Sequence, residues 1–112
     1  MLKFCSLYSG SSGNSLFVET PNAKVLIDAG VSTKKIETAL NDIEVDIHDI
    51  DAILVTHEHS DHVKGLSTLA KKFDIPIYAN QETWDAMPEI AEKVQLENQN
   101  FFKPNEKFDI GD

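Results

Sequence analysis

The sequence predicts an α/β fold, with a mixed β-sheet and helices on one face of it. Short strands separated by a glycine- and serine-rich turn open the chain, which is typical of an antiparallel hairpin. From residue 50 onward, short apolar runs alternate with helical patterns, which is typical of parallel strands joined by crossover helices. We expect the helices to cover the outer face of the sheet. A chain of 112 residues has too few further elements to cover the inner face as well.

Three strands are predicted in the N-terminal part of the chain. They span residues 3–8, 15–19 and 24–28. The turn at residues 9–15, with the sequence Ser-Gly-Ser-Ser-Gly-Asn-Ser, joins the first two, and Pro21-Asn22 precedes the third. The turn at 9–15 is either a plain connection or a cradle of backbone amides and hydroxyls for an anion.

The middle of the chain is predicted to hold a helix, an acidic linker, a buried strand and a second helix. Ser32 is the expected N-cap of the first helix, which ends near Asp42. His48 lies in the linker among aspartates, and we interpret it as a solvated side chain rather than a metal ligand. The apolar, β-branched run 53–56 predicts a buried strand, and residues 62–74 carry apolar side chains at helical spacing.

The last third of the chain is predicted to add further strands and short helices. Their ranges are a strand at 75–79, a helix at 81–87 capped by Asn80, a short turn after Pro88, and strands at 101–103 and 107–110. Trp84 and Met87 are three residues apart, which favours core positions; stacking of Trp84 on a substrate is the alternative.

Composition restricts the class of protein. The formal net charge is −9, which argues against a broad basic surface that grips nucleic acid. It leaves open an enzyme that acts on phosphodiesters, because bound metal ions supply local positive charge. No apolar run reaches about 18 residues, and the N-terminus lacks the apolar stretch of a signal peptide. With one cysteine, Cys5, expected to be a buried thiol, the sequence predicts a cytoplasmic protein.

The segment His57-Glu58-His59-Ser60-Asp61-His62 carries the chemistry. It follows the buried strand directly, and α/β sheets commonly place their sites at such strand ends. Residues two apart in an extended segment point the same way, so His57 and His59 can reach one metal ion. Asp61 and His62, in the first helical turn, can reach a second ion. Imidazole with carboxylate suits Zn, Mn or Fe, and two ions about 3.5–4 Å apart can act together on one bond.

Asp28 closes the apolar strand at 24–28, which is an unusual place for a carboxylate. It is either a cap for the next turn or a carboxylate that holds a metal-binding histidine from behind. The spacing alone leaves these two interpretations even.

These motifs resemble the metallo-β-lactamase superfamily. The histidine segment, the strand before it, Gly65-Leu66 after it and Leu26-Ile27-Asp28-Ala29-Gly30 all match its pattern. The serine-glycine turn at 9–15 is similar to that of the YycJ/WalJ group of bacterial exonuclease-like phosphodiesterases. The resemblance implies an αββα sandwich about twice this length, of which residues 1–112 are the N-terminal half.

The resemblance also implies the roles of individual residues. His57 and His59 would bind the first metal ion, and Asp61 and His62 the second, with Asp61 also orienting the nucleophile. Asp28 would support the ligands, and Ser12 and Asn14 would hold a substrate phosphate. Family members supply three further ligands, a histidine, a bridging aspartate and a final histidine, and none is present in these 112 residues.

The expected activity is metal-dependent hydrolysis of phosphodiester bonds by the full-length protein, as an exonuclease-like nuclease with two divalent ions, Zn or Mn, or Fe. The alternative within the enzyme class is a small-molecule phosphodiesterase or a thioester hydrolase of the same superfamily. The alternative of another class is a non-catalytic fragment that self-associates, for example as a homodimer through the uncovered sheet face. We expect a single incomplete domain, cut before the remaining ligands and inactive by itself.

Overall fold

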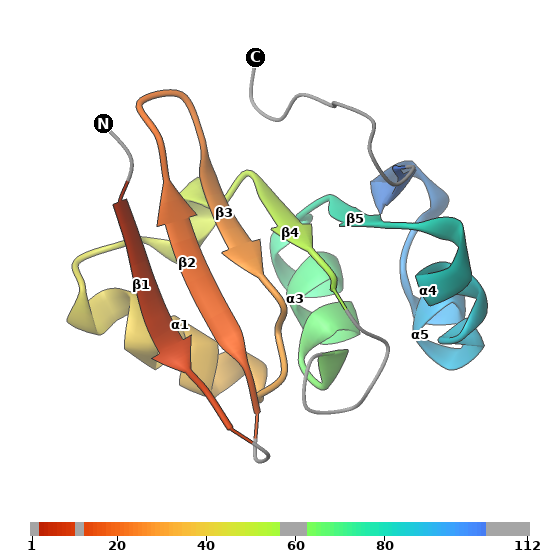
Figure 1. The fold of residues 1–112 in the computed structure, drawn as a ribbon, viewed down its shortest axis with the longest axis horizontal. Coiled ribbons are helices and arrows are strands. Elements are labelled where there is room, and N and C mark those ends of the chain that lie inside the picture. Colours follow the sequence, from red (N-terminus) through yellow and green to blue (C-terminus); the bar gives the residue numbers. More distant parts are fainter. Residues whose placement is uncertain (1–2, 11–12, 57–62, 103–112) are drawn as a thin grey trace.

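A six-stranded mixed sheet organises the molecule, in the order β1-β2-β3-β4-β5-β6 (Figure 1). The computed structural model describes residues 3–10, 13–56 and 63–102. Its strands are β1 (Lys3–Tyr8), β2 (Ser15–Glu19), β3 (Lys24–Ile27), β4 (Ala52–Leu54), β5 (Ile77–Ala79) and β6 (Gln99–Phe101). The first three pair antiparallel, and β3 to β6 pair parallel, as a hairpin followed by helical crossovers requires.

The helices follow the predicted pattern. They are α1 (Thr33–Asp42), α3 (Leu66–Phe73), α4 (Gln81–Asp85) and α5 (Pro88–Lys93), with 3₁₀ turns η1 (Ile47–Asp49) and η2 (Leu96–Asn98). The Ser32 side chain accepts from the backbone N–H of Lys35, and that of Asn80 accepts from Thr83, so both predicted N-caps are confirmed. α4 ends at Asp85, and α5 starts anew at Pro88, which suits the first turn of a helix.

The core lies between the sheet and its helices. Leu26, Ile53 and Ile77 come from three neighbouring parallel strands, stand at register positions of one another and are fully buried. The helices add further fully buried side chains to this layer: Ile36, Leu40, Leu66 and Leu69. α1 and α3 lie on the same side of the sheet (Figure 1), which confirms a mixed sheet with helices on one face.

The opposite face of the sheet carries a second apolar row. Leu16, Ile27, Leu54 and Tyr78 are register partners across four strands, and each is partly exposed. At the sheet edge, Phe4 is 71% exposed. Within the described residues this face is therefore less covered than the helical face, as the sequence predicts. Homodimerisation through it stays a prediction.

Two strand predictions need correction. Cys5 lies in β1 but is only partly buried, because β1 is an edge strand in which no residue is fully buried. The last described strand begins at Gln99 rather than at Phe101, although the segment before Phe101 is polar. The amide of Gln99 donates to the carbonyl oxygens of Ala91 (2.8 Å) and Val94 (2.9 Å), so burial costs this side chain no hydrogen bond. The strand predicted at 107–110 lies outside the described residues.

The core positions of Trp84 and Met87 are confirmed, with 3% and 5% of their surfaces exposed. The indole N–H of Trp84 donates to the carbonyl oxygen of Asn100 at 2.9 Å, which ties α4 to β6. The ring thus serves packing rather than substrate stacking. In the described part of the chain, no helix has both the length and the apolar character needed to cross a membrane.

Candidate metal centre

Asp28 links the ends of two parallel strands. It follows β3 directly with a φ of 66°, in the left-handed region that aspartate tolerates better than most residues. From there its buried carboxylate reaches across to the segment just after β4, where one oxygen accepts from the backbone N–H of Thr56 at 2.8 Å. The other oxygen accepts from the Thr56 hydroxyl at 2.6 Å. Both hydrogen bonds go to the residue just before His57, and the two roles of Asp28 stay predictions.

Ala29 anchors the start of α3 in a similar way. Its carbonyl oxygen accepts from the backbone N–H of Gly65 at 2.8 Å. A side chain at Gly65 has no room, because a Cβ there would lie 2.3 Å from the carbonyl oxygen of Val31. The chain after the histidine segment therefore passes in close contact with the turn that follows β3.

These two contacts lie before and after the histidine segment in the chain. Thr56 is bonded to Asp28 and Gly65 to Ala29, so adjacent residues of one turn fix the chain before and after residues 57–62. The predicted metal ligands themselves, namely His57, His59, Asp61 and His62, lie outside the described residues. Within the described residues, no group of three histidine, cysteine, aspartate or glutamate side chains could hold a metal ion.

The serine-glycine turn packs against the same turn after β3. The backbone N–H of Gly30 donates to the carbonyl oxygen of Asn14 at 2.8 Å, and the buried Ser15 hydroxyl donates to that of Asp28 at 2.9 Å. The Asn14 amide closes the turn on itself, since its Nδ2 donates to the Gly10 carbonyl oxygen and its Oδ1 accepts from the Gly10 N–H. Ser12 lies outside the described residues, and phosphate binding by either residue stays a prediction.

His48 is separate from this edge of the sheet. It lies in η1, before the start of β4, whereas the histidine segment follows the end of that strand. Its exposed ring contacts Asp46, with Nδ1 2.8 Å from a carboxylate oxygen, and it meets the Phe73 ring edge-on. Hydrogen bonds from the backbone N–H and the ring of His48 lower the pKa of Asp46. The prediction of a solvated side chain is confirmed.

The donor chemistry fits a metal pair at this edge. The three imidazoles and the Asp61 carboxylate, all within six residues, are ligand types that Zn, Mn and Fe take in proteins. The buried carboxylate of Asp28, one residue from the segment through Thr56, adds negative charge of the kind found behind metal ligands. Sequence reasoning missed Thr56 and the carbonyl of Ala29, whose roles depend on backbone contacts between distant segments and leave no local signal.

Comparisons with known proteins agree with this geometry. Residues 8–112 match the family model of the metallo-beta-lactamase superfamily. The chain is 45% identical over 111 residues to "Exodeoxyribonuclease YycJ" of Bacillus anthracis, covering 99% of this chain and 42% of that protein. It is 45% identical over 112 residues to "Exodeoxyribonuclease WalJ" of Streptococcus pneumoniae serotype 2, again covering 42% of the relative.

Solved structures share the fold. A B3 metallo-beta-lactamase with an active-site glutamic acid superposes with a TM-score of 0.78 at 22% identity, over 96% of this chain and 46% of that one. The chain thus spans less than half the length of the proteins it matches here. On the family match and the 45% identity over nearly all its residues, the chain belongs to the metallo-beta-lactamase superfamily.

Proposed function

We propose that the full-length protein is a metal-dependent hydrolase of phosphodiester bonds, and specifically an exonuclease-like nuclease. One observation carries the proposal: Thr56 and Gly65, which precede and follow a six-residue segment rich in metal ligands, are both bonded to the turn after β3, at the carboxyl edge of a parallel sheet. Similarity to two exodeoxyribonucleases over at least 98% of the chain supports nucleic acid as the substrate.

The ligands divide between two ions. His57 and His59 would bind one ion, and Asp61 and His62 the other, with Zn or Mn as the expected metals and Fe as a further possibility. When bound, the ions would activate a water molecule and neutralise charge on the phosphate. Asp61 would in addition orient the nucleophile. Four ligands are too few for two ions, so we propose that further ligands come from protein outside these 112 residues, which are inactive alone.

The remaining proposed roles are to position the metal ligands and to bind the substrate. Asp28 would position the histidine segment through Thr56, and Ser12 and Asn14 would contact a phosphate of the substrate. A cytoplasmic location is part of the proposal, because Cys5 is a lone thiol.

Metal removal tests the proposal directly. We expect the full-length protein to digest labelled DNA or RNA, to lose this activity in EDTA, and to recover it when Mn²⁺ or Zn²⁺ is restored. Cleavage that persists in EDTA would contradict the proposal. Hydrolysis of a bis-aryl phosphodiester or a thioester, with no action on either nucleic acid, would instead establish the alternative small-molecule activity.

Asp28→Asn tests the positioning role. Asparagine tolerates the φ of 66° and can still accept from the Thr56 N–H, but it brings no negative charge. We expect metal affinity, measured by titration with Zn²⁺, to fall about 10–100-fold, with little change in melting temperature. Asp28→Ala should also lower the melting temperature, since alanine is strained at this φ. If Asp28→Asn bound metal as tightly as the wild type, Asp28 would have no role in positioning the metal ligands and would serve the fold only.

A further inference from the structure

A cationic cleft lies on the helical side of the molecule, between α3 and α5. It has a volume of about 780 Å³. Side chains of these two helices line it: Ser67, Thr68, Lys71, Lys72, Glu92 and Lys93. Three lysines oppose one glutamate here, whereas the chain as a whole has a formal net charge of −9. The cleft is therefore a local exception to the acidic character of the protein.

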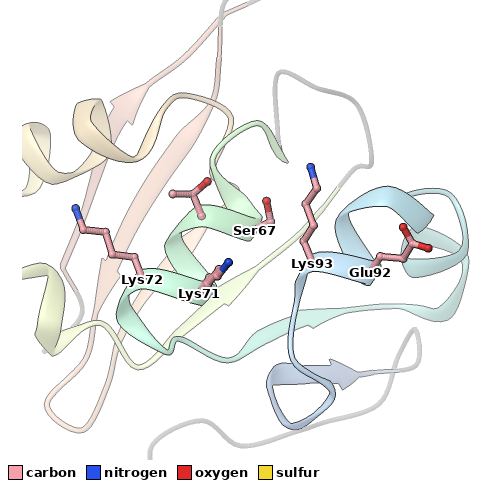
Figure 2. Close-up of a pocket in the computed structure, with 6 residues that line it drawn as sticks. Ser67, Lys71, Lys72, Glu92 and Lys93 are labelled. Carbon is pink, nitrogen blue, oxygen red and sulfur yellow. The ribbon is translucent and has the colours of Figure 1, made fainter.

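Lysines from both helices line the cleft. Figure 2 shows Lys71 of α3 on the side of α5, and Lys93 of α5 extending beside Ser67 of α3 and not toward Lys71. Lys72 points to the other side of α3, where its Nζ lies 5.3 Å from the centroid of the Phe73 ring. Glu92 points away from α3. The cleft thus carries one lysine from each helix beside hydroxyl groups, and its one carboxylate is turned away from α3.

Helix-end electrostatics does not account for this arrangement. Lys71 and Lys93 lie in the last turns of their helices, where the helix dipole favours a cation. That effect explains a lysine at each helix end, but not that lysines of two different helices line one cleft. The ion pairs among the described residues are Lys24–Asp49 and His48–Asp46, so neither cleft lysine has a carboxylate partner there. Two unpaired cations on one cleft favour an anionic ligand.

The cleft begins close to the candidate metal centre. Gly65, bonded to Ala29, fixes the start of α3 at the strand-end edge, and Ser67 lies in the first turn of the helix. An eight-residue helix is about 12 Å long, so the cleft extends from that edge along α3 over roughly this distance. The exposed Lys64 lies three residues before Ser67, on the side of the histidine segment. A linear polyanion that leaves the edge along α3 would meet these lysines in turn.

We infer that the α3–α5 cleft binds the phosphate backbone of the nucleic-acid substrate, away from the bond that is cleaved. The inference rests on the proposed function for the identity of the substrate. Lysine ammonium groups bind phosphates as point charges, and the hydroxyls of Ser67 and Thr68 can donate to phosphate oxygens. Such contacts are independent of sequence, and they offset the repulsion between a polyanion and an acidic protein.

The test compares two double variants of the full-length protein. Lys71→Gln/Lys93→Gln removes the cleft cations, and Lys34→Gln/Lys35→Gln removes two exposed lysines of α1 with the same change in net charge. Binding of a labelled single-stranded DNA is measured by fluorescence anisotropy in EDTA, at several salt concentrations. We expect the cleft variant to bind about tenfold more weakly, with a salt slope lower by about 1.4 for two lost phosphate contacts. The α1 variant should bind within about twofold of the wild type.

Other outcomes separate this inference from the proposed function. Equal weakening in both double variants, or no DNA binding at low salt, would overturn the inference. Competition by polyglutamate as effective as that by DNA would assign the cleft to acidic proteins and overturn it too. A bis-aryl phosphodiester is too short to extend along the cleft, so both variants should cleave it like the wild type. Loss of that cleavage in the cleft variant would overturn the inference, because the cleft lysines would then support the metal centre rather than bind a distant stretch of the polyanion. If the protein bound DNA through the cleft lysines but cleaved no phosphodiester, the proposed hydrolase function would be refuted and the inference about the cleft would stand.

Discussion

Replacing His59 by alanine in the full-length protein is expected to lower phosphodiester cleavage by at least about a hundredfold. Loss of a residue that merely supports a ligand already costs 10–100-fold in metal affinity or activity, and His59 is a proposed ligand itself. Thr56 and Gly65, before and after the segment that contains His59, are both bonded to the turn that follows β3. Cleavage rate and metal content, measured on the same preparation, check the prediction, and both should fall together.

His48→Ala is the matched control for this variant. It removes the same side chain from an exposed position, where, among the described residues, the ring contacts Asp46 and Phe73. Cleavage and metal content should stay at the wild-type values, and the pKa of Asp46 should rise as the ring's hydrogen bond is lost. Equal cleavage by His59→Ala and His48→Ala would refute the proposed metal ligands.

The parts of the fold that local patterns determine could be predicted from the sequence. Continuous apolar runs identified the central strands, and their residues Leu26, Ile53 and Ile77 are fully buried. The caps Ser32 and Asn80 marked the starts of two helices, because their side chains accept from free N–H groups of the first turn. The spacing of apolar residues and the identity of a helix cap depend on residues close together in the chain, so both can be found from a single sequence.

The geometry that positions the candidate site could not be predicted in the same way. Asp28 and Thr56 are 28 residues apart, and their contact depends on a left-handed backbone at Asp28 and on parallel pairing of β3 with β4. The sequence indicates that the Asp28 carboxylate is unusual, but it does not identify the residue to which that carboxylate is hydrogen-bonded. The start of β6 was missed for a related reason, since the polar Gln99 finds its hydrogen bonds on the end of α5.

Alanine at Gly65 is expected to destabilise the fold by about 3 kcal/mol, because the new Cβ has no room. It would lie 2.3 Å from the carbonyl oxygen of Val31 and 3.5 Å from that of Ala29, and backbone atoms cannot turn aside as a flexible side chain can. Gly65 is the N-cap of α3, a position that also favours glycine over alanine, so the poorer cap adds to the clash. The change in melting temperature therefore measures how far the surrounding backbone can move to accept the Cβ.

Thermal melting of Gly65→Ala beside Thr68→Ala provides this measurement. Thr68 is an exposed residue of α3, so its replacement changes helix propensity without a close backbone contact, and its melting temperature should stay within a few degrees of the wild type. Gly65→Ala should melt at least about 10 °C lower, and it should also bind metal more weakly, since the Gly65 N–H holds the chain after the histidine segment to Ala29. A melting temperature at or above that of the wild type would mean that the turn after β3 yields readily. Such a turn would be too soft to hold the proposed ligands in place from both ends.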